Sequence, residues 1–176
     1  MSDTTIRLVL NGWYLSRGTY MSGVITREKV AKEAQEVSIT TNGRIAWDGR
    51  EWETLCFIPL DENEADFVLK EVTIGVGFHW QRKEDQRFKG ALELIVEQEK
   101  LTAVNHVRVE DYLTSVISSE MSALASEELL KAHAVISRSW LLANMKSIEQ
   151  KHPELKAHPE RHRWPMPTTP DEGEEH

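Results

Sequence analysis

Cysteine is almost absent from this chain, which has a single one, Cys56, among 176 residues. An intrachain disulfide is therefore excluded, and cysteine usage gives no indication of the redox compartment. A lone cysteine is most often a small buried hydrophobe, and we expect this of Cys56. A chain of this length can bury a sufficient core without cross-links, and its length is typical of one domain.

Basic clusters and long apolar runs are also missing. The formal net charge is -8, and no block of lysine and arginine is available to neutralise a phosphate backbone, which argues against nucleic acid as the main partner. No stretch of about 18 consecutive apolar residues occurs, and the segment 1–10 has neither the basic nor the apolar part of a signal peptide. We therefore expect no membrane segment in this chain. Whether the native protein is cytoplasmic or has lost a leader stays open.

Turn-forming pairs punctuate the N-terminal part of the chain. Asn11-Gly12, Asn42-Gly43 and Asp48-Gly49 lie between apolar, β-branched or aromatic runs, and such pairs favour the type I′ turns that join two strands tightly. Hairpins are therefore predicted for about the first hundred residues. The segment 37–57 is predicted to form a meander.

Further alternation predicts more strands and then a change of structure. Apolar residues alternate along Val72–Trp80 and along Leu92–Val96, before a turn at Glu97–Lys100, so one face of this sheet is expected in the core. After His106 the apolar period changes from two to about 3.6 residues, which indicates helices. Strands followed by helices predict an α+β domain over residues 1–149, β-rich in 1–106 and helical in 107–149.

Six tryptophans are many for this length. Trp47, Trp52 and Trp80 could stack on sugar rings in a groove, but each lies on an apolar alternation, which favours the core. His79 and the charged run Arg82–Arg87 are expected to form a solvated connection between strands.

The segment 150–176 contains five of the six prolines and four of the seven histidines, with almost no apolar periodicity. We expect a linker or tail. His152, His158 and His162 are candidate metal ligands, but nothing fixes a fourth ligand, and the prolines interrupt the helical spacing that would align them.

Glu120 occupies an unusual position in the first predicted helix. At about 100 degrees per residue, five apolar residues from 109 to 117 form one stripe. Glu120 continues that stripe, whereas Glu110 and Asp111 point to the polar side. A carboxyl group against apolar walls loses solvation of its charged form, so its pKa is expected to rise and the group can act as a general acid. Alternatively, the helix ends near Ser118 and Glu120 turns into water.

Glycoside cleavage needs such a proton donor, because the leaving sugar oxygen must be protonated as the bond breaks. Local spacing places no second carboxylate beside Glu120. This disfavours an ordinary two-carboxylate hydrolase, although a partner from elsewhere in the fold stays open.

The next segment, Glu127–Met145, is apolar nearly all round and is predicted to be a central helix with Ser126 as its N-cap. Arg138 stands out in it. A buried arginine needs acceptors, so we expect Arg138 to face the same cleft as Glu120 or a polar substrate. The alternative is an exposed side chain whose stem lies along apolar surface.

Four coupled motifs lie between residues 88 and 138: Phe88-Lys89-Gly90, Leu101–Leu113, Val116–Met121 and Leu130–Arg138. Together they resemble the SpoIID/LytB family of stage II sporulation protein D and the amidase enhancers, over roughly 87–145. In that family, a Val-Asn motif leads into Glu-Asp-Tyr-Leu, a Glu-Met pair follows, and a Lys-Ala-Gln-Ala helix ends in arginine.

The resemblance implies that Glu120 is the catalytic glutamate of a lytic transglycosylase. Glu120 would protonate the glycosidic oxygen and then act as base toward the C6 hydroxyl of the same N-acetylmuramoyl sugar, closing a 1,6-anhydro ring. The resemblance also implies a location in the cell envelope, peptidoglycan strands stripped of peptides as substrate, and an amidase as a functional partner.

The sequence departs from the family pattern at three positions. Ser118 and Ser122 stand where prolines often flank Glu-Met, and His133 replaces the usual glutamine. His133 and Arg138 are the substrate-binding residues that we expect beside Glu120. Family members continue past this helix, some with histidines and cysteines that hold zinc. This resemblance implies no cofactor in the present chain, zinc only in a C-terminal continuation, and leaves open that the chain is an incomplete, inactive part.

Two other functions stay open. One is a non-catalytic cell-wall module that enhances an N-acetylmuramoyl-L-alanine amidase, and the other is a structural α+β domain that shares only ancestry with the family.

Overall fold

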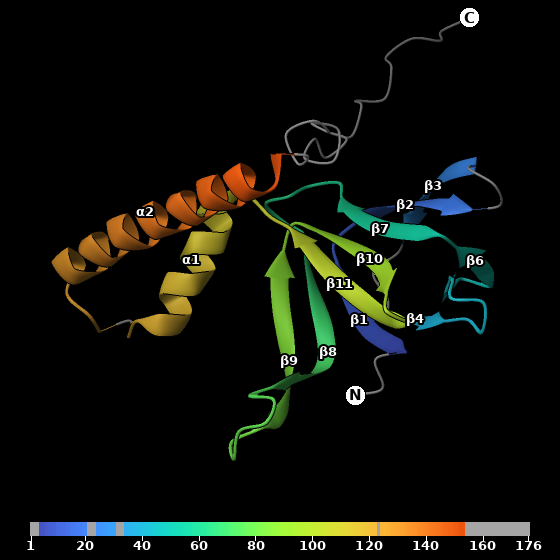
Figure 1. Cartoon of the computed structure of the whole chain (residues 1–176), viewed down its shortest axis with the longest axis horizontal. Helices are drawn as coiled ribbons and strands as arrows, with labels where there is room; N and C mark the ends of the chain where they lie inside the picture. Colours follow the sequence, from blue (N-terminus) through green and yellow to red (C-terminus); the bar gives the residue numbers. More distant parts are fainter. Residues whose placement is uncertain (1–3, 21–23, 31–33, 123, 154–176) are drawn as a thin grey trace, which may run out of the picture. The chain divides into compact units, whose positions relative to one another are not determined.

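The computed structural model describes residues 4–20, 24–30, 34–122 and 124–153. The chain divides into two compact units, Met1–Val107 and Arg108–His176. Strands make up the first unit and helices the second (Figure 1). The α+β fold expected from the change of period is therefore confirmed, and the boundary between the units follows His106 closely. The assignment of 1–149 to a single domain stays a prediction.

The strands of the first unit form two antiparallel sheets. One sheet has the order β6-β5-β4-β1-β8-β9, and its strands are β1 (Thr5–Asn11), β4 (Ala34–Ile39), β5 (Ile45–Trp47), β6 (Arg50–Trp52), β8 (Asp66–Ile74) and β9 (Arg82–Lys89). The other has the order β11-β10-β7-β2-β3, and its strands are β2 (Tyr14–Tyr20), β3 (Val24–Val30), β7 (Thr54–Pro59), β10 (Ala91–Glu97) and β11 (Lys100–His106).

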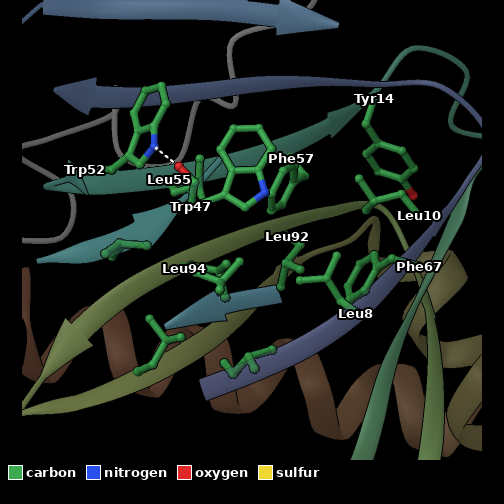
Figure 2. Close-up of a cluster of buried hydrophobic side chains, with 14 of the residues drawn as sticks. Leu8, Leu10, Tyr14, Trp47, Trp52, Leu55, Phe57, Phe67, Leu92 and Leu94 are labelled. Atoms are coloured by element: carbon green, nitrogen blue, oxygen red, sulfur yellow. Dashed lines mark hydrogen bonds between the residues drawn. The ribbon is translucent and has the colours of Figure 1, made fainter. Parts of the chain in front are cut away.

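The inner faces of both sheets contribute to one apolar core (Figure 2). Trp47 packs edge-on against Phe57, with ring centroids 5.1 Å apart. The indole N–H of Trp52 donates to the backbone oxygen of Trp47 at 3.2 Å, so this buried polar group has a partner. The core position expected for Trp47 and Trp52 is therefore confirmed.

Cys56 lies on β7 and is partly buried. Its thiol donates to the backbone oxygen of Leu92 at 3.1 Å. Burial, with the nearby charge of Glu93 as a second cause, raises the pKa of the Cys56 thiol. A thiol held in this state is a poor nucleophile.

The turn-forming pairs have three different outcomes. At Asp48-Gly49 both residues have positive φ, 51° and 70°, and β5 pairs with β6 across them, as the type I′ prediction requires. At Asn42-Gly43 the hairpin between β4 and β5 is confirmed, but only Gly43 has a positive φ, and its N–H donates to the Thr40 oxygen at 3.0 Å. This is a longer hairpin loop closed by a left-handed glycine.

The hairpin predicted at Asn11-Gly12 is wrong, because β1 and β2 lie in different sheets. Gly12 has φ 102°, and a Cβ there would lie 3.0 Å from the Ala65 Cβ. Asn11 donates to the Asp66 carboxylate at 2.7 Å. The pair signals a tight turn, but it does not say which strand becomes the hydrogen-bonded partner.

The strand predicted over Val72–Trp80 is wrong beyond Ile74, where β8 ends. Gly75 and Gly77 follow with φ values of 67° and 80°, a conformation that ends the pleated alternation. The core position expected for Trp80 is also wrong, because its side chain is 47% exposed.

The connection between β8 and β9 is correspondingly shorter than expected. Residues 82–87 belong to β9, so the connection expected there is wrong. The run is solvated as expected, since all of its residues except Gln86 are exposed. His79 does lie in the connection and is exposed, as expected.

Gly18 on β2 makes room for the core. A Cβ at this position would overlap the Trp52 ring and the Thr54 backbone oxygen. We expect Gly18→Ala to lower the free energy of unfolding by about 1–3 kcal/mol, the usual cost of an overpacked site. Chemical denaturation followed by tryptophan fluorescence measures this. An unchanged midpoint would contradict the close packing.

The β10–β11 turn carries two residues that disfavour its conformation. Gln98 and Glu99 have φ values of 49° and 62°, although neither is glycine or asparagine. Replacing the pair with Asn-Gly should raise the free energy of unfolding by about 1 kcal/mol. Gly49→Ala, at the equivalent position of the β5–β6 turn, is the matched control and should lower it. A loss of stability in the Asn-Gly variant would contradict the turn assignment.

Candidate functional site

The first helix, α1, spans Val109–Glu120. Glu110 and Asp111 lie in its first turn, where the helix dipole favours negative charge, and Arg108 donates to Asp111 at 2.7 Å. Leu113 is its buried residue, at 5% exposure. The stripe predicted for this helix therefore buries its N-terminal half more fully than its C-terminal half.

Glu120 is the last residue of α1, and the N–H of Met121 donates to the Ile117 oxygen beyond it. Its side chain is 57% exposed. The burial expected from the helical wheel is therefore wrong, and the alternative of a helix that ends beside water is closer. A helical wheel assumes that the helix continues and stays packed on its apolar side. Because α1 ends at Glu120, this side chain has no further helical turn beside it to provide apolar neighbours.

The second helix, α2, spans Glu127–Lys151. The predicted N-cap is confirmed, since the Ser126 side chain accepts from the Leu129 N–H at 3.3 Å. The central position predicted for this helix is wrong, because no residue of α2 is buried in the described structure. Val135 and Trp140, for example, are 67% and 66% exposed.

Glu120 and His133 come together across the hairpin formed by α1 and α2. The His133 Nε2 lies 3.1 Å from the Glu120 Oε2, and the His133 side chain is only 25% exposed. One proton fits between these two atoms: the imidazole donates to a carboxylate, or a carboxylic acid donates to the imidazole. Glu120 and His133 thus place a proton donor and a proton acceptor next to each other at the end of α1.

The sequence singled out both residues but did not predict this contact. His133 was expected to contact substrate because it replaces a glutamine of the family pattern. One signal in the sequence could have predicted the contact. Histidine and the glutamine that it replaces can both donate a hydrogen bond to a neighbouring carboxylate. A polar side chain facing inward on a mostly apolar helix needs such a partner.

Arg138 has a different partner from the expected one. Its Nη2 donates to the Oε2 of Glu110, and the two side chains are 53% and 67% exposed. The buried position expected for Arg138 is therefore wrong, and the alternative of an exposed side chain holds. The side chain does bond to an acceptor, but this is Glu110 and not Glu120. This ion pair connects the first turn of α1 to the middle of α2.

The described residues contain no group of three or more His, Cys, Asp or Glu side chains that could hold a metal ion. His152 follows the end of α2, where its N–H donates to the Ile148 oxygen. His158 and His162 lie outside the described residues. Of the predicted tail 150–176, residues 150 and 151 belong to α2, and everything after 153 lies outside the described part.

In the part of the chain that the structure describes, neither helix is long and apolar enough to cross a membrane.

Part of the chain matches a known family model. The family model SpoIID, described as Stage II sporulation protein, matches residues 97–169. The matched segment includes β11, α1, α2 and the Glu120–His133 pair. It begins after Phe88-Lys89-Gly90 and continues past Met145, so its bounds differ from the expected 87–145. No curated protein and no solved structure matches the chain.

The Ser126 cap fixes the start of α2, the helix that carries His133. Loss of the cap is therefore expected to weaken the contact between His133 and Glu120. We expect Ser126→Ala to reduce helical stability by about 1 kcal/mol, because the Leu129 N–H loses its acceptor. Ser139→Ala is the matched control, since Ser139 lies within α2 and donates to the Val135 oxygen. Thermal unfolding followed by far-UV circular dichroism distinguishes them, and equal midpoints for the two variants would contradict the cap.

Proposed function

We propose that this chain, whose residues 97–169 match the SpoIID family model, cleaves the glycan strands of peptidoglycan as a lytic transglycosylase. The family match indicates a sporulation-related cell-wall protein. The observation that supports the finer proposal is the Glu120–His133 contact inside the matched segment. It gives Glu120, the family's acid/base position by resemblance, a partner that can share its proton.

Glu120 performs both proton transfers in the proposed reaction. As an acid it protonates the glycosidic oxygen while the bond from C1 of the N-acetylmuramoyl sugar breaks. As a carboxylate it then removes the proton of the C6 hydroxyl, whose oxygen bonds to C1 and closes the 1,6-anhydro ring. Protons balance over the two steps, because Glu120 ends as it began. No water is consumed, so one carboxyl group is sufficient.

His133 acts as a positioning residue. Between the two steps Glu120 carries a full charge, and an imidazole N–H at 3.1 Å can donate to one carboxylate oxygen. The other oxygen is then free to face the sugar. Since 57% of the Glu120 side chain is exposed, a polymer can reach it from solution.

Arg138 is proposed as a substrate contact at the edge of this site. Its side chain remains 53% exposed while it pairs with Glu110, and a guanidinium has five N–H donors, so further donors are available to sugar oxygens. For the zinc that the resemblance implies in a C-terminal continuation, the described residues offer no group of three or more His, Cys, Asp or Glu side chains. Peptide-stripped strands are the proposed substrate, so an amidase acts before this protein.

The exposure of Glu120 also favours a second candidate. Glycosidases usually enclose the reacting sugar, whereas an open carboxylate suits a surface that only binds glycan. In this alternative the chain is a non-catalytic cell-wall module that enhances an N-acetylmuramoyl-L-alanine amidase.

Mass spectrometry of peptide-free glycan strands after incubation with the protein tests the reaction. The wild-type chain should release fragments with 1,6-anhydro ends, and Glu120→Gln should slow their release by about 100-fold or more, the contribution typical of general acid catalysis. Strand binding and the free energy of unfolding should stay unchanged, because Glu120 is exposed. Glu127→Gln, which removes an exposed carboxylate paired with Lys131, is the matched control and should keep full activity.

His133 adds a second comparison. His133→Ala should slow release by about tenfold, whereas His133→Gln should retain most activity, because an amide N–H also donates to the carboxylate. No fragments from the wild-type chain, together with equal stimulation of an amidase by wild type and Glu120→Gln, would reject the transglycosylase and support the enhancer.

A further inference from the structure

The loop between β8 and β9, residues 75–81, displays three large apolar side chains to solvent. Val76 is 72% exposed, Phe78 62% and Trp80 47%. Phe78 and Trp80 stack on each other, with centroids 5.4 Å apart and an interplanar angle of 16°. The loop stands away from the other strands at the end of the β8–β9 hairpin (Figure 1). Exposed apolar groups gathered at one tip usually mark an interaction site.

The loop has a defined conformation. The Phe78 N–H donates to the Gly75 oxygen at 2.9 Å, and the Gln81 N–H donates to the Phe78 oxygen at 3.0 Å. The Gln81 side chain accepts from the Gly77 N–H at 3.0 Å. A Cβ at Gly75 would overlap the Trp80 ring, so this glycine lets the indole lie against the backbone. The aromatic pair is therefore displayed on a preformed support.

The end of the hairpin carries two basic residues in a stretch that is bounded by Glu71 and Glu84. Residues 72–83 contain Arg82 and Lys83 but no Asp or Glu, although the whole chain has a formal net charge of -8. These two basic residues lie opposite Ile74 and Thr73 in the strand register, directly behind the loop. Arg82 pairs with Glu84 at 2.9 Å. No described residue forms an ion pair with Lys83.

The base of the hairpin is bent and clamped. The β8–β9 register shifts between Leu69 and Val72, and Glu71 has φ 54°. Asp85 accepts from the Glu71 N–H at 3.0 Å and also pairs with Lys70. Such a bulge re-aims the strands that follow it. It fixes the direction in which the tip leaves the sheet.

We propose that this tip binds peripherally to the surface of an anionic phospholipid bilayer. Trp80, Phe78 and Val76 enter the interfacial region, where amphipathic aromatic rings are favoured. Lys83 and Arg82 lie one step behind them, at the level of the headgroup phosphates. Apolar burial and attraction to anionic lipid add together in peripheral binding. A sugar surface would instead surround its aromatic ring mainly with hydrogen-bonding side chains. His79 and Gln81 flank Trp80, but Gln81 already bonds to the Gly77 N–H, and the exposed Val76 and Phe78 are apolar.

Sedimentation of the full chain with vesicles tests the proposal. Wild type should bind phosphatidylcholine vesicles that contain phosphatidylglycerol, bind pure phosphatidylcholine more weakly, and dissociate as salt rises. The double variant Phe78→Ser, Trp80→Ser should weaken binding by about tenfold or more, since two large apolar groups no longer leave water. Lys83→Gln should weaken binding to the anionic vesicles by about fivefold.

Two matched controls separate the tip from the rest of the surface. Trp13→Ser removes an indole that is also 47% exposed but lies outside the hairpin. Lys89→Gln removes a lysine about 20 Å further along the same strand, beyond the Debye length of about 8 Å. Both controls should bind as wild type does.

Three outcomes would overturn the proposal. Wild type could fail to sediment with anionic vesicles, or bind them equally well after the tip substitutions. Alternatively, the tip variants could lose binding to peptide-free glycan strands while wild type ignores vesicles, which would make the tip a sugar surface. Lys83→Gln changes only an exposed side chain, so its result does not depend on the loop keeping its shape.

Discussion

The contact between Glu120 and His133 is the interaction on which the proposed chemistry depends. It joins the last residue of α1 to α2, while the Glu110–Arg138 ion pair joins the first turn of α1 to the same helix. Neither pair is buried, and exposed ion pairs contribute about 0.2–1 kcal/mol each. No described residue of α2 is buried, so apolar burial on this helix adds little to the two contacts. In the proposed function, a glycan strand that binds beside Glu120 and His133 would therefore also hold these two side chains in a fixed arrangement.

The sequence predicted most of what depends on local chemistry. The Asp48-Gly49 turn, the Ser126 cap and the change from strands to helices after His106 all follow from residue types at short spacing. The pairing of strands could not be predicted from the sequence, because packing of the whole core decides which strands pair. At Asn11-Gly12 the chain does turn tightly, but it passes from one sheet to the other.

The same limit applies to the candidate site. Periodicity placed Glu120 among apolar residues but could not show that α1 ends there. It also buried Arg138, whose side chain is in fact exposed and pairs with Glu110. Resemblance supplied the role of Glu120, and geometry added His133 as its neighbour. The sequence did not predict the β8–β9 loop, because apolar residues continue to alternate through Gly75 and Gly77. In the structure both glycines have positive φ, and the strand has already ended before them.

The central claim is that glycan meets the protein at the end of α1. Amide chemical shifts of the isotope-labelled Glu120→Gln variant, titrated with peptide-free glycan strands, test it directly, because this variant should bind without cleaving. If glycan binds there, the largest chemical-shift changes are expected around Glu120 and along the turn of α2 that carries His133. Changes confined to the strands of residues 4–107, with the helices unaffected, would contradict it.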